Sequence, residues 1–247
     1  MTRGLRQIVR LNWPFYAVAV IAVLAGPPLA QQLPLPQWAR IAVLAGVSIV
    51  AAWLLASLAA SWIVYDRSRL MQWDWVLQAL GFDPASWINL HAGLDESTPA
   101  LRTIFKDAPG RVFDIYDPTE MTEPSIARAR RIANNEVSPE RADFCRLPVP
   151  TGTVDVATLL LSAHELRSDT ARLALFAELR RVLGPGGRVV VAEHLRDWAN
   201  FFAFGPGFLH FHSRRTWMRC FTRNRFHVHT EFSITPFVRI FVLRRLT

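Results

Sequence analysis

Residues 178–194, ELRRVLGPGGRVVVAEH, join the end of one predicted helix to a strand through a glycine-rich turn. Upstream of the turn, apolar side chains recur at the spacing that lines one buried face of a helix: Leu173, Leu175, Phe176, Leu179, Val182 and Leu183. Pro185 lies between glycines, which favours an abrupt end to the helix. The following run, 188–194, is short, apolar and rich in valine, as in a strand buried on both faces of a sheet. The stretch therefore predicts a helix–turn–strand unit of an α/β domain.

Strand and helix patterns alternate on both sides of this unit. The predicted strands are 87–90, 111–116, a weakly marked one around 137–144, 153–162 and 188–194. The predicted helices between and after them are 97–108, 123–134, 168–184 and 213–223. The last two apolar runs, 226–234 and 237–245, are separated by Thr-Pro and predict an antiparallel hairpin. This order is typical of a mostly parallel α/β sheet.

Two long apolar runs precede the domain. Residues 13–30 carry no charge, and 41–64 form a longer uncharged run. Each approaches or exceeds the roughly 20 apolar residues that span a bilayer. We therefore expect a transmembrane helical hairpin at 1–64, a juxtamembrane linker helix at 65–86 and one domain at 87–247. Two buried core helices, or a cleaved signal peptide in place of the first span, are the alternatives.

The charges around the spans predict their orientation. Three arginines precede the first span and two follow the second, whereas the loop between the spans holds only Arg40. Basic residues concentrate on the cytoplasmic side of membrane proteins. Both termini and the domain are therefore predicted on the cytoplasmic side of the inner membrane.

Composition narrows the choice of partners. The 247 residues carry a formal net charge of +8, which suits an anionic surface. A membrane anchor favours lipid headgroups over nucleic acid, so we expect membrane lipids as partners and no nucleic acid. The two cysteines, Cys145 and Cys220, are far apart and outside any metal-ligand spacing, as expected of reduced cytoplasmic thiols.

Two segments, 142–166 (ADFCRLPVPTGTVDVATLLLSAHEL) and 178–197, carry a resemblance to a known family. With the element order, they make residues 87–247 resemble the class I S-adenosylmethionine-dependent methyltransferases, of the type 11 kind. The resemblance implies a Rossmann-like, doubly wound, seven-stranded and mostly parallel sheet that ends in an antiparallel hairpin. It also implies S-adenosyl-L-methionine as the cofactor.

The resemblance assigns binding roles to acids that follow the predicted strands. Asp117, in IYDP after the second strand, would accept hydrogen bonds from the ribose hydroxyls, with Asp114 as the alternative. Asp143 would take the adenine amino group, and Phe144 would lie beside the ring.

The stretch 87–98, WINLHAGLDEST, takes the place of the family's glycine-rich turn, of which only the central glycine remains. The implied contacts are with Asn89, His91, Gly93, Asp95 and Glu96. Because a sulfonium donor carries no phosphate, its turn need not cradle a dense anion. Asp95 or Glu96 would instead meet the ammonium group of the donor.

Catalytic candidates follow the fourth and fifth strands. His164 and Glu165 follow one, and Glu193 and His194 end the other. Strand ends of this kind face the reaction crevice, and a base is needed where the acceptor must lose a proton. His164 is the first choice of base, with a purely structural histidine as the alternative. No metal site is predicted, because no carboxylate or thiol completes a ligand set beside the HFH and HVH histidines.

The phenylalanine-rich stretch 200–212 predicts either a greasy pocket wall, a membrane-dipping surface or ordinary core packing. With the two spans, it indicates a lipophilic acceptor, such as a quinone-like ring or a lipid. The sequence therefore predicts a membrane-anchored methyltransferase. The alternative is a catalytically inactive scaffold or partner subunit with an eroded cofactor turn, and a dinucleotide-dependent oxidoreductase ranks lower because the phosphate glycines are missing.

Overall fold

The computed structural model describes residues 2–133 and 138–246. It divides into two compact units. The first contains the chain up to Arg67 together with Asp197–Phe208, and the second contains Ser68–Arg196 and the chain from Leu209 onward. Each unit is described by itself.

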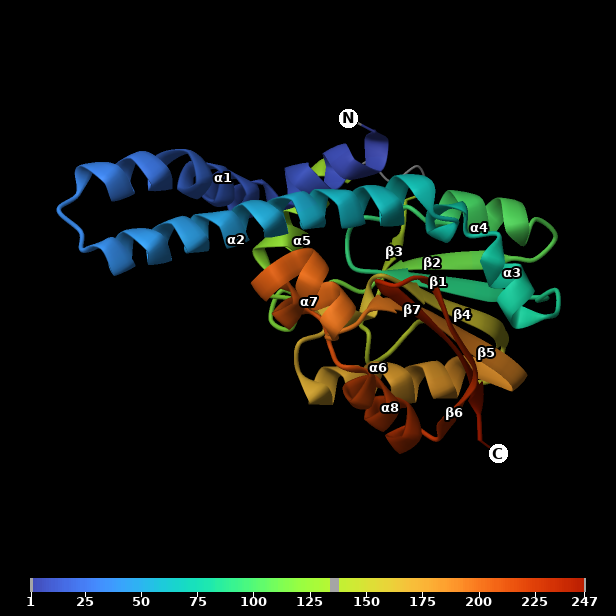
Figure 1. Cartoon of the computed structure of the whole chain (residues 1–247). Coiled ribbons are helices and arrows are strands. Elements are labelled where there is room, and N and C mark those ends of the chain that lie inside the picture. The colour runs from blue at the N-terminus through green and yellow to red at the C-terminus, as the bar shows by residue number, and fades with distance from the viewer. Residues whose placement is uncertain (1, 134–137, 247) are drawn as a thin grey trace. The chain divides into compact units, whose positions relative to one another are not determined.

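The first unit is built on a pair of long helices, α1 (Arg3–Gln32) and α2 (Gln37–Trp62), which form a hairpin (Figure 1). Arg40 at the start of α2 donates through Nε to the carbonyl of Ala30, 3.0 Å away, at the end of α1. Large apolar side chains such as Phe15 and Leu55 are 74% and 67% exposed. Both helices are long and apolar enough to cross a membrane, which by itself is weak evidence of membrane association.

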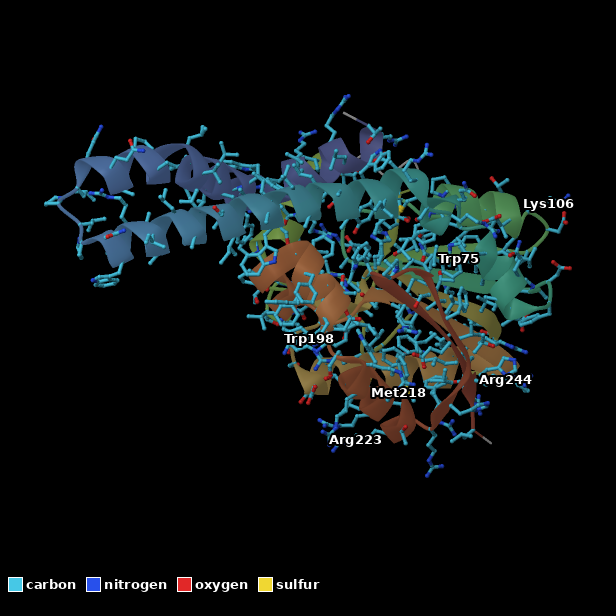
Figure 2. The ribbon with its side chains drawn as sticks, viewed as in Figure 1. Trp75, Lys106, Trp198, Met218, Arg223 and Arg244 are labelled. Carbon is cyan, nitrogen blue, oxygen red and sulfur yellow. The ribbon has the colours of Figure 1, made fainter. Side chains whose placement is uncertain are left out.

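A third helix of this unit, α7 (Trp198–Phe204), comes from far along the sequence. Its Phe201 ring meets the Trp53 ring of α2 edge to face, with 5.5 Å between the centroids. Trp198 and Phe202 are 75% and 65% exposed, and Figure 2 shows the Trp198 side chain standing off the helix. The segment that was expected to belong to the domain therefore groups with the N-terminal hairpin.

The segment predicted as one linker helix is broken into short turns. Ile63–Arg67 is a π-helical turn, Leu70–Gln72 a 3-10 turn and α3 (Trp75–Leu80) a short helix. Gly81 ends α3 with φ 72°, a conformation that glycine adopts without a steric cost. In the second unit, the Trp75 ring is buried and lies 6.1 Å from the Phe232 ring.

A seven-stranded sheet forms the core of the second unit, as the resemblance implied. Its strands are β1 (Trp87–His91), β2 (Gly110–Asp114), β3 (Glu140–Arg141), β4 (Val154–Leu160), β5 (Leu183–His194), β6 (Phe226–Thr235) and β7 (Val238–Arg245). They lie in the order β3-β2-β1-β4-β5-β7-β6. β1 to β5 pair in parallel, and β7 pairs antiparallel with both β5 and β6. Only two residues of the weakly marked third strand pair, and part of its predicted range, Val137, lies outside the described residues.

The stretch that opened the sequence analysis folds as predicted, with one difference. α6 (Asp169–Val182) is capped by Ser168, whose hydroxyl accepts from the amide of Ala171 at 3.0 Å. β5 begins at Leu183 rather than after the turn, because Leu183 already pairs with Val154 before a register shift. A Cβ on Gly187 would lie 2.9 Å from the carbonyl oxygen of Val154, so glycine permits this close approach.

Helices cover both faces of the sheet. α6 and α8 (Arg214–Arg223) lie on one side and α4 (Thr98–Ile104) on the other, and α5 (Pro124–Ile132) links β2 to β3 (Figure 1). The Phe176 ring of α6 lies 5.2 Å from that of Phe221 and 6.3 Å from that of Trp217, both on α8. All three side chains are fully buried, so this aromatic cluster fixes α8 against α6.

Replacing Phe176 with alanine should lower the free energy of unfolding of the second unit by about 3–5 kcal/mol, because the ring leaves a cavity at the centre of the cluster. Denaturant unfolding of the full chain in detergent, followed by near-ultraviolet circular dichroism, measures the change. Phe202→Ala removes the same atoms from a side chain that is 65% exposed and is the matched control. Equal losses in the two variants would contradict the assigned core.

Candidate functional site

Polar residues gather where parallel strands end beside the point at which the strand order reverses. β1 has β2 on one side and β4 on the other, and the chain turns to opposite sides of β1 as it enters these two strands. Ligands of open α/β sheets bind in the crevice outside such strand ends. The ends of β1, β2 and β5 are His91, Asp114 and His194.

Asn89 lies inside the sheet and is 1% exposed. Its Nδ2 donates to the hydroxyls of Ser97 and Thr98 at 3.0 and 2.9 Å, and its Oδ1 accepts from the Thr158 hydroxyl at 2.7 Å. The amide therefore ties β1 to the start of α4 and to β4. In the structure Asn89 therefore stabilises the turn between β1 and α4 through its hydrogen bonds to Ser97 and Thr98.

His91 follows as a buried, neutral side chain. Its Nδ1 accepts from the amide of Gly93 at 3.2 Å, so Nε2 carries the ring proton. Burial lowers the pKa of His91, against the opposing charges of Asp95 and Asp114. The Nε2–H is buried and makes no hydrogen bond to any of the described residues. Oδ2 of Asp95 lies 4.0 Å from this nitrogen, which is beyond hydrogen-bond distance, so the donor is unsatisfied.

The two acids of the turn have different settings. Asp95 is 3% exposed at its side chain, and its Oδ1 accepts from the amides of Ser97 and Thr98 at 3.1 and 3.0 Å. Ser97 is the N-cap residue of α4, and Asp95, two residues earlier, forms an Asx-turn that fixes the start of the helix. Glu96, by contrast, is exposed on the turn.

Asp114 ends β2 and is held by a side chain that the sequence did not single out. Arg130 of α5 binds both its carboxylate oxygens, at 2.9 and 2.8 Å, and also donates to the carbonyl of Ala92 at 3.0 Å. Burial raises the pKa of Asp114, but hydrogen bonds from Arg130 and the amide of Tyr116 outweigh it, and the pKa is lowered. A Cβ on Gly93 would lie 2.6 Å from Cγ of Arg130, so this side chain fills the space beside the remaining glycine.

The other predicted donor-binding residues lie further from the strand ends. Asp117 is three residues beyond β2, and its Oδ1 accepts from the amide of Thr119 at 2.7 Å. Asp143 is exposed after β3 and accepts from the amide of Cys145 at 2.8 Å. Phe144 is 7% exposed and belongs to the hydrophobic core.

The predicted catalytic residues His164 and Glu193 form a buried pair. His164 lies on the 3-10 turn after β4 (Ala163–Glu165), and its Nδ1 is 2.6 Å from Oε2 of Glu193 on β5. Glu193 is fully buried, and its Oε1 accepts from the amides of Ala163 and His164 at 2.8 and 3.2 Å. Burial lowers the pKa of His164, but Glu193 and Glu165 outweigh that effect and raise the pKa to about 10. His164 is therefore an imidazolium at neutral pH.

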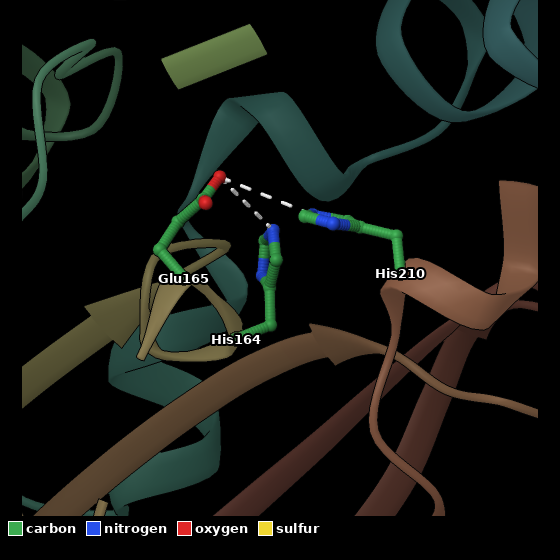
Figure 3. Close-up of side chains that lie close together, drawn as sticks. All are labelled: His164, Glu165 and His210. Atoms are coloured by element: carbon green, nitrogen blue, oxygen red, sulfur yellow. Dashed lines mark ion pairs between the residues drawn. The ribbon is translucent and has the colours of Figure 1, made fainter. Parts of the chain in front are cut away.

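Glu165 and His210 complete a compact cluster with His164 (Figure 3). Oε1 of Glu165 is 3.5 Å from Nε2 of His164 and 4.0 Å from Nε2 of His210. The ligand atoms of the three residues all lie within 4.8 Å of one another. The reason given from the sequence for expecting no metal, that no carboxylate completes a histidine set, is therefore wrong: the fold brings the carboxylate of Glu165 to His210 of the HFH motif.

His194 is the last residue of β5. Its Nδ1 donates to the carbonyl of Phe237 at 2.9 Å, and its ring stacks on that of Phe211 with 4.9 Å between the centroids. These contacts give it a packing role at the end of β5. Of the four predicted catalytic side chains, the structure brings together His164, Glu165 and Glu193.

Three functional candidates were missed from the sequence: Arg130, His210 and Glu123, whose Oε1 lies 3.3 Å from Nδ1 of His210. The repeated arginines of 123–134 signal a basic helix but not which of them turns toward β2. His210 was noted only as part of the HFH motif, and nothing local to Glu123 distinguishes it from a solvated acid.

The residues at the β1 and β2 ends fit an S-adenosylmethionine-like donor. Asp114 supplies a carboxylate at a strand end, His91 an unpartnered buried N–H, and Gly93 a backbone without a side chain. The fit requires the Arg130 side chain, 23% exposed, to move from its position beside Gly93.

Known proteins share parts of this chain. A family described as a methyltransferase domain matches residues 106–191. The ubiquinone/menaquinone biosynthesis C-methyltransferase UbiE of Burkholderia vietnamiensis is 33% identical over 114 residues, and that of Burkholderia mallei 32%. The match covers 45% of this chain and 44% of each relative, so it spans less than half the length of these curated proteins.

Solved structures share the fold. A SAM-dependent methyltransferase from Aquifex aeolicus superposes with a TM-score of 0.54 at 16% identity, over 72% of this chain and 93% of its own. Geranyl diphosphate C-methyltransferase from Streptomyces coelicolor gives 0.52 at 18% identity, over 71% and 78%. The sheet order and the matched segment agree: residues 106–191 are the part of this chain that matches a methyltransferase domain, and the second unit has the fold of solved S-adenosylmethionine-dependent methyltransferases, whose methyl donor is S-adenosylmethionine.

Proposed function

We propose that this chain is a membrane-anchored methyltransferase that transfers a methyl group from S-adenosylmethionine to a lipophilic small molecule or lipid. The observation that carries the proposal is the convergence of polar groups at one edge of the sheet, within and beside the segment that matches the family. Both termini and the catalytic unit would lie on the cytoplasmic side of the inner membrane.

On the donor side, we assign the ribose hydroxyls to Asp114 in preference to Asp117. Asp114 is the last residue of β2, and it pairs in register with His91 beside the turn. Asp117 lies three residues further on and folds back on Thr119. The Nε2–H of His91 and the exposed carboxylate of Glu96 would meet the amino-acid end of the donor. S-adenosylmethionine supplies an electrophilic methyl group there.

On the acceptor side, His164 would contact the group that receives the methyl. Its raised pKa makes it a donor of a hydrogen bond and a positive charge at neutral pH, rather than the base expected from the sequence. An imidazolium fixed by a buried carboxylate favours the deprotonated form of an acceptor hydroxyl, whose proton leaves to solvent before the transfer. The transfer itself consumes the negative charge of the acceptor, so His164 would act by making the phenolate or enolate available.

The acceptor class rests on two supports. The C-methyltransferases of ubiquinone and menaquinone biosynthesis act on quinone precursors by name, and this chain is similar to them over 114 residues. Two long apolar helices and the exposed aromatic rings of Trp198 and Phe202 suit a bilayer and its surface. Anchoring at the bilayer raises the effective concentration of a membrane-dissolved acceptor.

An inactive scaffold is the second candidate, and the Arg130 contact favours it. A guanidinium that neutralises Asp114 and fills the space beside Gly93 opposes donor binding until it moves. In a scaffold, the same contact would be permanent.

Asp114→Asn should weaken S-adenosylmethionine binding by at least about tenfold, or about 1.4 kcal/mol, because the amide replaces a carboxylate that accepts both ribose hydroxyls. Isothermal calorimetry of the full chain in detergent measures it. Asp117→Asn is the matched control and should stay within about twofold. A loss of affinity in Asp117→Asn but not in Asp114→Asn would assign the ribose hydroxyls to Asp117. If the unaltered chain gives no heat at millimolar donor, the inactive scaffold is favoured.

Arg130→Met should tighten donor binding, by roughly tenfold, because the unaltered chain must first withdraw the guanidinium from Asp114. The titration belongs at pH 8, since without Arg130 burial raises the pKa of Asp114 and favours its protonated form at lower pH. Arg131→Met, an exposed arginine of the same helix, is the control. Weaker binding in Arg130→Met would show that Arg130 itself holds the donor.

The two cysteines test the topology. Cys145 is exposed in the second unit, whereas Cys220 is buried and burial raises its pKa to about 12. A membrane-impermeant maleimide should label inverted membrane vesicles, whose cytoplasmic face is outside, and leave intact spheroplasts unlabelled. Cys145→Ser should abolish the label and Cys220→Ser should not. Labelling of spheroplasts would reverse the orientation, and release of the chain by alkaline carbonate would contradict anchoring.

A further inference from the structure

We propose that His164, Glu165 and His210 form a binding site for a divalent metal ion of the Zn²⁺ class, and that Glu123 orients the His210 ring from its other nitrogen. All four side chains belong to the second unit. They come from the 3-10 turn after β4, the segment before α8 and the residue that precedes α5. Metal binding at this place goes beyond the function proposed above: with an ion bound, His164 is a neutral ligand, and the ion takes over the positive charge that the imidazolium supplies in the metal-free protein.

The donor atoms are already near a metal-binding arrangement. Zn²⁺ bonds to nitrogen and oxygen are about 2.0–2.2 Å long, which places neighbouring ligand atoms of a tetrahedral site about 3.4 Å apart. Glu165 Oε1 is 3.5 Å from His164 Nε2 and 4.0 Å from His210 Nε2. Glu123 Oε1 lies 3.3 Å from the other ring nitrogen of His210. The ligand atoms of His164, Glu165 and His210 lie within 4.8 Å of one another, so small side-chain shifts bring them to one ion with water as a fourth ligand, while Glu123 holds the other nitrogen of His210.

Glu165 offers an oxygen that the protein does not use. Its Oε2 is buried and makes no hydrogen bond within residues 2–133 and 138–246. A buried carboxylate oxygen without a partner is costly, and a bound cation satisfies it. This observation is independent of the distances between the ligands.

Glu193 orients His164 in the manner of a metal ligand. It holds Nδ1 of the imidazole at 2.6 Å and leaves Nε2 facing Glu165. Histidines that ligate metals almost always donate their second ring N–H to a carboxylate or carbonyl in this way. On metal binding, the proton of Nε2 leaves to solvent, and the Nδ1 proton stays on the hydrogen bond to Glu193.

The charge around the cluster favours a cation. The charged groups that act on the two histidines are Glu193, Glu165 and Glu123, with Arg167 as the opposing one. With both imidazoles neutral, three carboxylates and one guanidinium leave an excess of two negative charges. Arg167 donates to the backbone carbonyls of His164 and His210, so it also fixes the two histidines relative to each other. The side chain of the ligand His210 is 22% exposed, so the site is in contact with solvent.

Two imidazoles with a carboxylate select the metal class. Mg²⁺ and Ca²⁺ prefer oxygen ligands alone, whereas Zn²⁺, Fe²⁺ and Co²⁺ take imidazole readily. Co²⁺ is the useful probe, because it replaces Zn²⁺ in such sites and absorbs visible light in a way that reports its ligand geometry.

The test is a Co²⁺ titration of the full chain in detergent, followed by visible absorption, with Zn²⁺ competition to confirm the site. We expect one ion per chain. His210→Ala and Glu165→Gln should each weaken binding by at least about tenfold, since even the loss of an outer partner of a ligand costs that much. His210 is partly exposed and Glu165→Gln is nearly isosteric, so both variants keep the fold; far-ultraviolet circular dichroism checks this.

The double variant His227→Ala/His229→Ala is the matched control. Both histidines are exposed on β6 with the same spacing as His210 and His212, and this variant should bind Co²⁺ as the unaltered chain does. Loss of binding in the control, or unchanged affinity in both His210→Ala and Glu165→Gln, would overturn the proposal. Donor binding, measured separately on the same variants, distinguishes a failed metal site from a failed methyltransferase assignment.

Discussion

A single buried carboxylate, that of Glu193, determines the geometry of the edge at which the site lies. It is fully buried on β5, yet it accepts two backbone amides and the His164 ring from the turn after β4. A carboxylate in such a position is tolerated only where hydrogen bonds replace the water it has lost. The turn after β4 is therefore held at the end of β5, and the direction in which His164 and Glu165 face follows from it. Removing this one group would leave two amides and an imidazolium without their common acceptor.

The same edge carries a second constraint of opposite character. Arg130 and Asp114 neutralise each other at the ends of β1 and β2, where the donor is proposed to bind. The contact between Glu193 and His164 is shielded from solvent. The Arg130 side chain, by contrast, is partly exposed and lies two residues before α5 ends at Ile132. One half of the edge is thus rigid, and the other half depends on a side chain that can be displaced. The side chain of Arg130 fills the space beside Gly93 in the turn after β1.

Much of the fold follows from the sequence, because the helical spacing of apolar residues marks α6 and a short valine-rich run after a glycine-rich turn marks β5. The early start of β5 at Leu183 was not predictable, since it depends on pairing with Val154 on another strand. The site was predicted in part. Strand ends indicated His164, Glu165 and Glu193 because their position along the chain fixes their edge. The position of Arg130 beside Asp114 depends on how α5 is rotated about its axis. The position of His210 beside Glu165 depends on the path of the chain over the 46 residues after His164. The local sequence indicates neither.

The route of the chain through α7 has a consequence for any attempt to obtain the domain alone. The chain passes from the first unit to the second near Arg67, returns at Asp197 and leaves again after Phe208. The sequence of the second unit is therefore interrupted by residues 197–208. These residues belong to the first unit, where Phe201 packs against Trp53 of α2. A fragment that begins after the hairpin would keep α7 but strip the cover from Phe201, adding an apolar surface to the exposed rings of Trp198 and Phe202. Such a fragment should aggregate unless residues 197–208 are replaced by a short polar loop. An autonomous catalytic unit therefore has three boundaries in the sequence: after Arg67, before Asp197 and after Phe208.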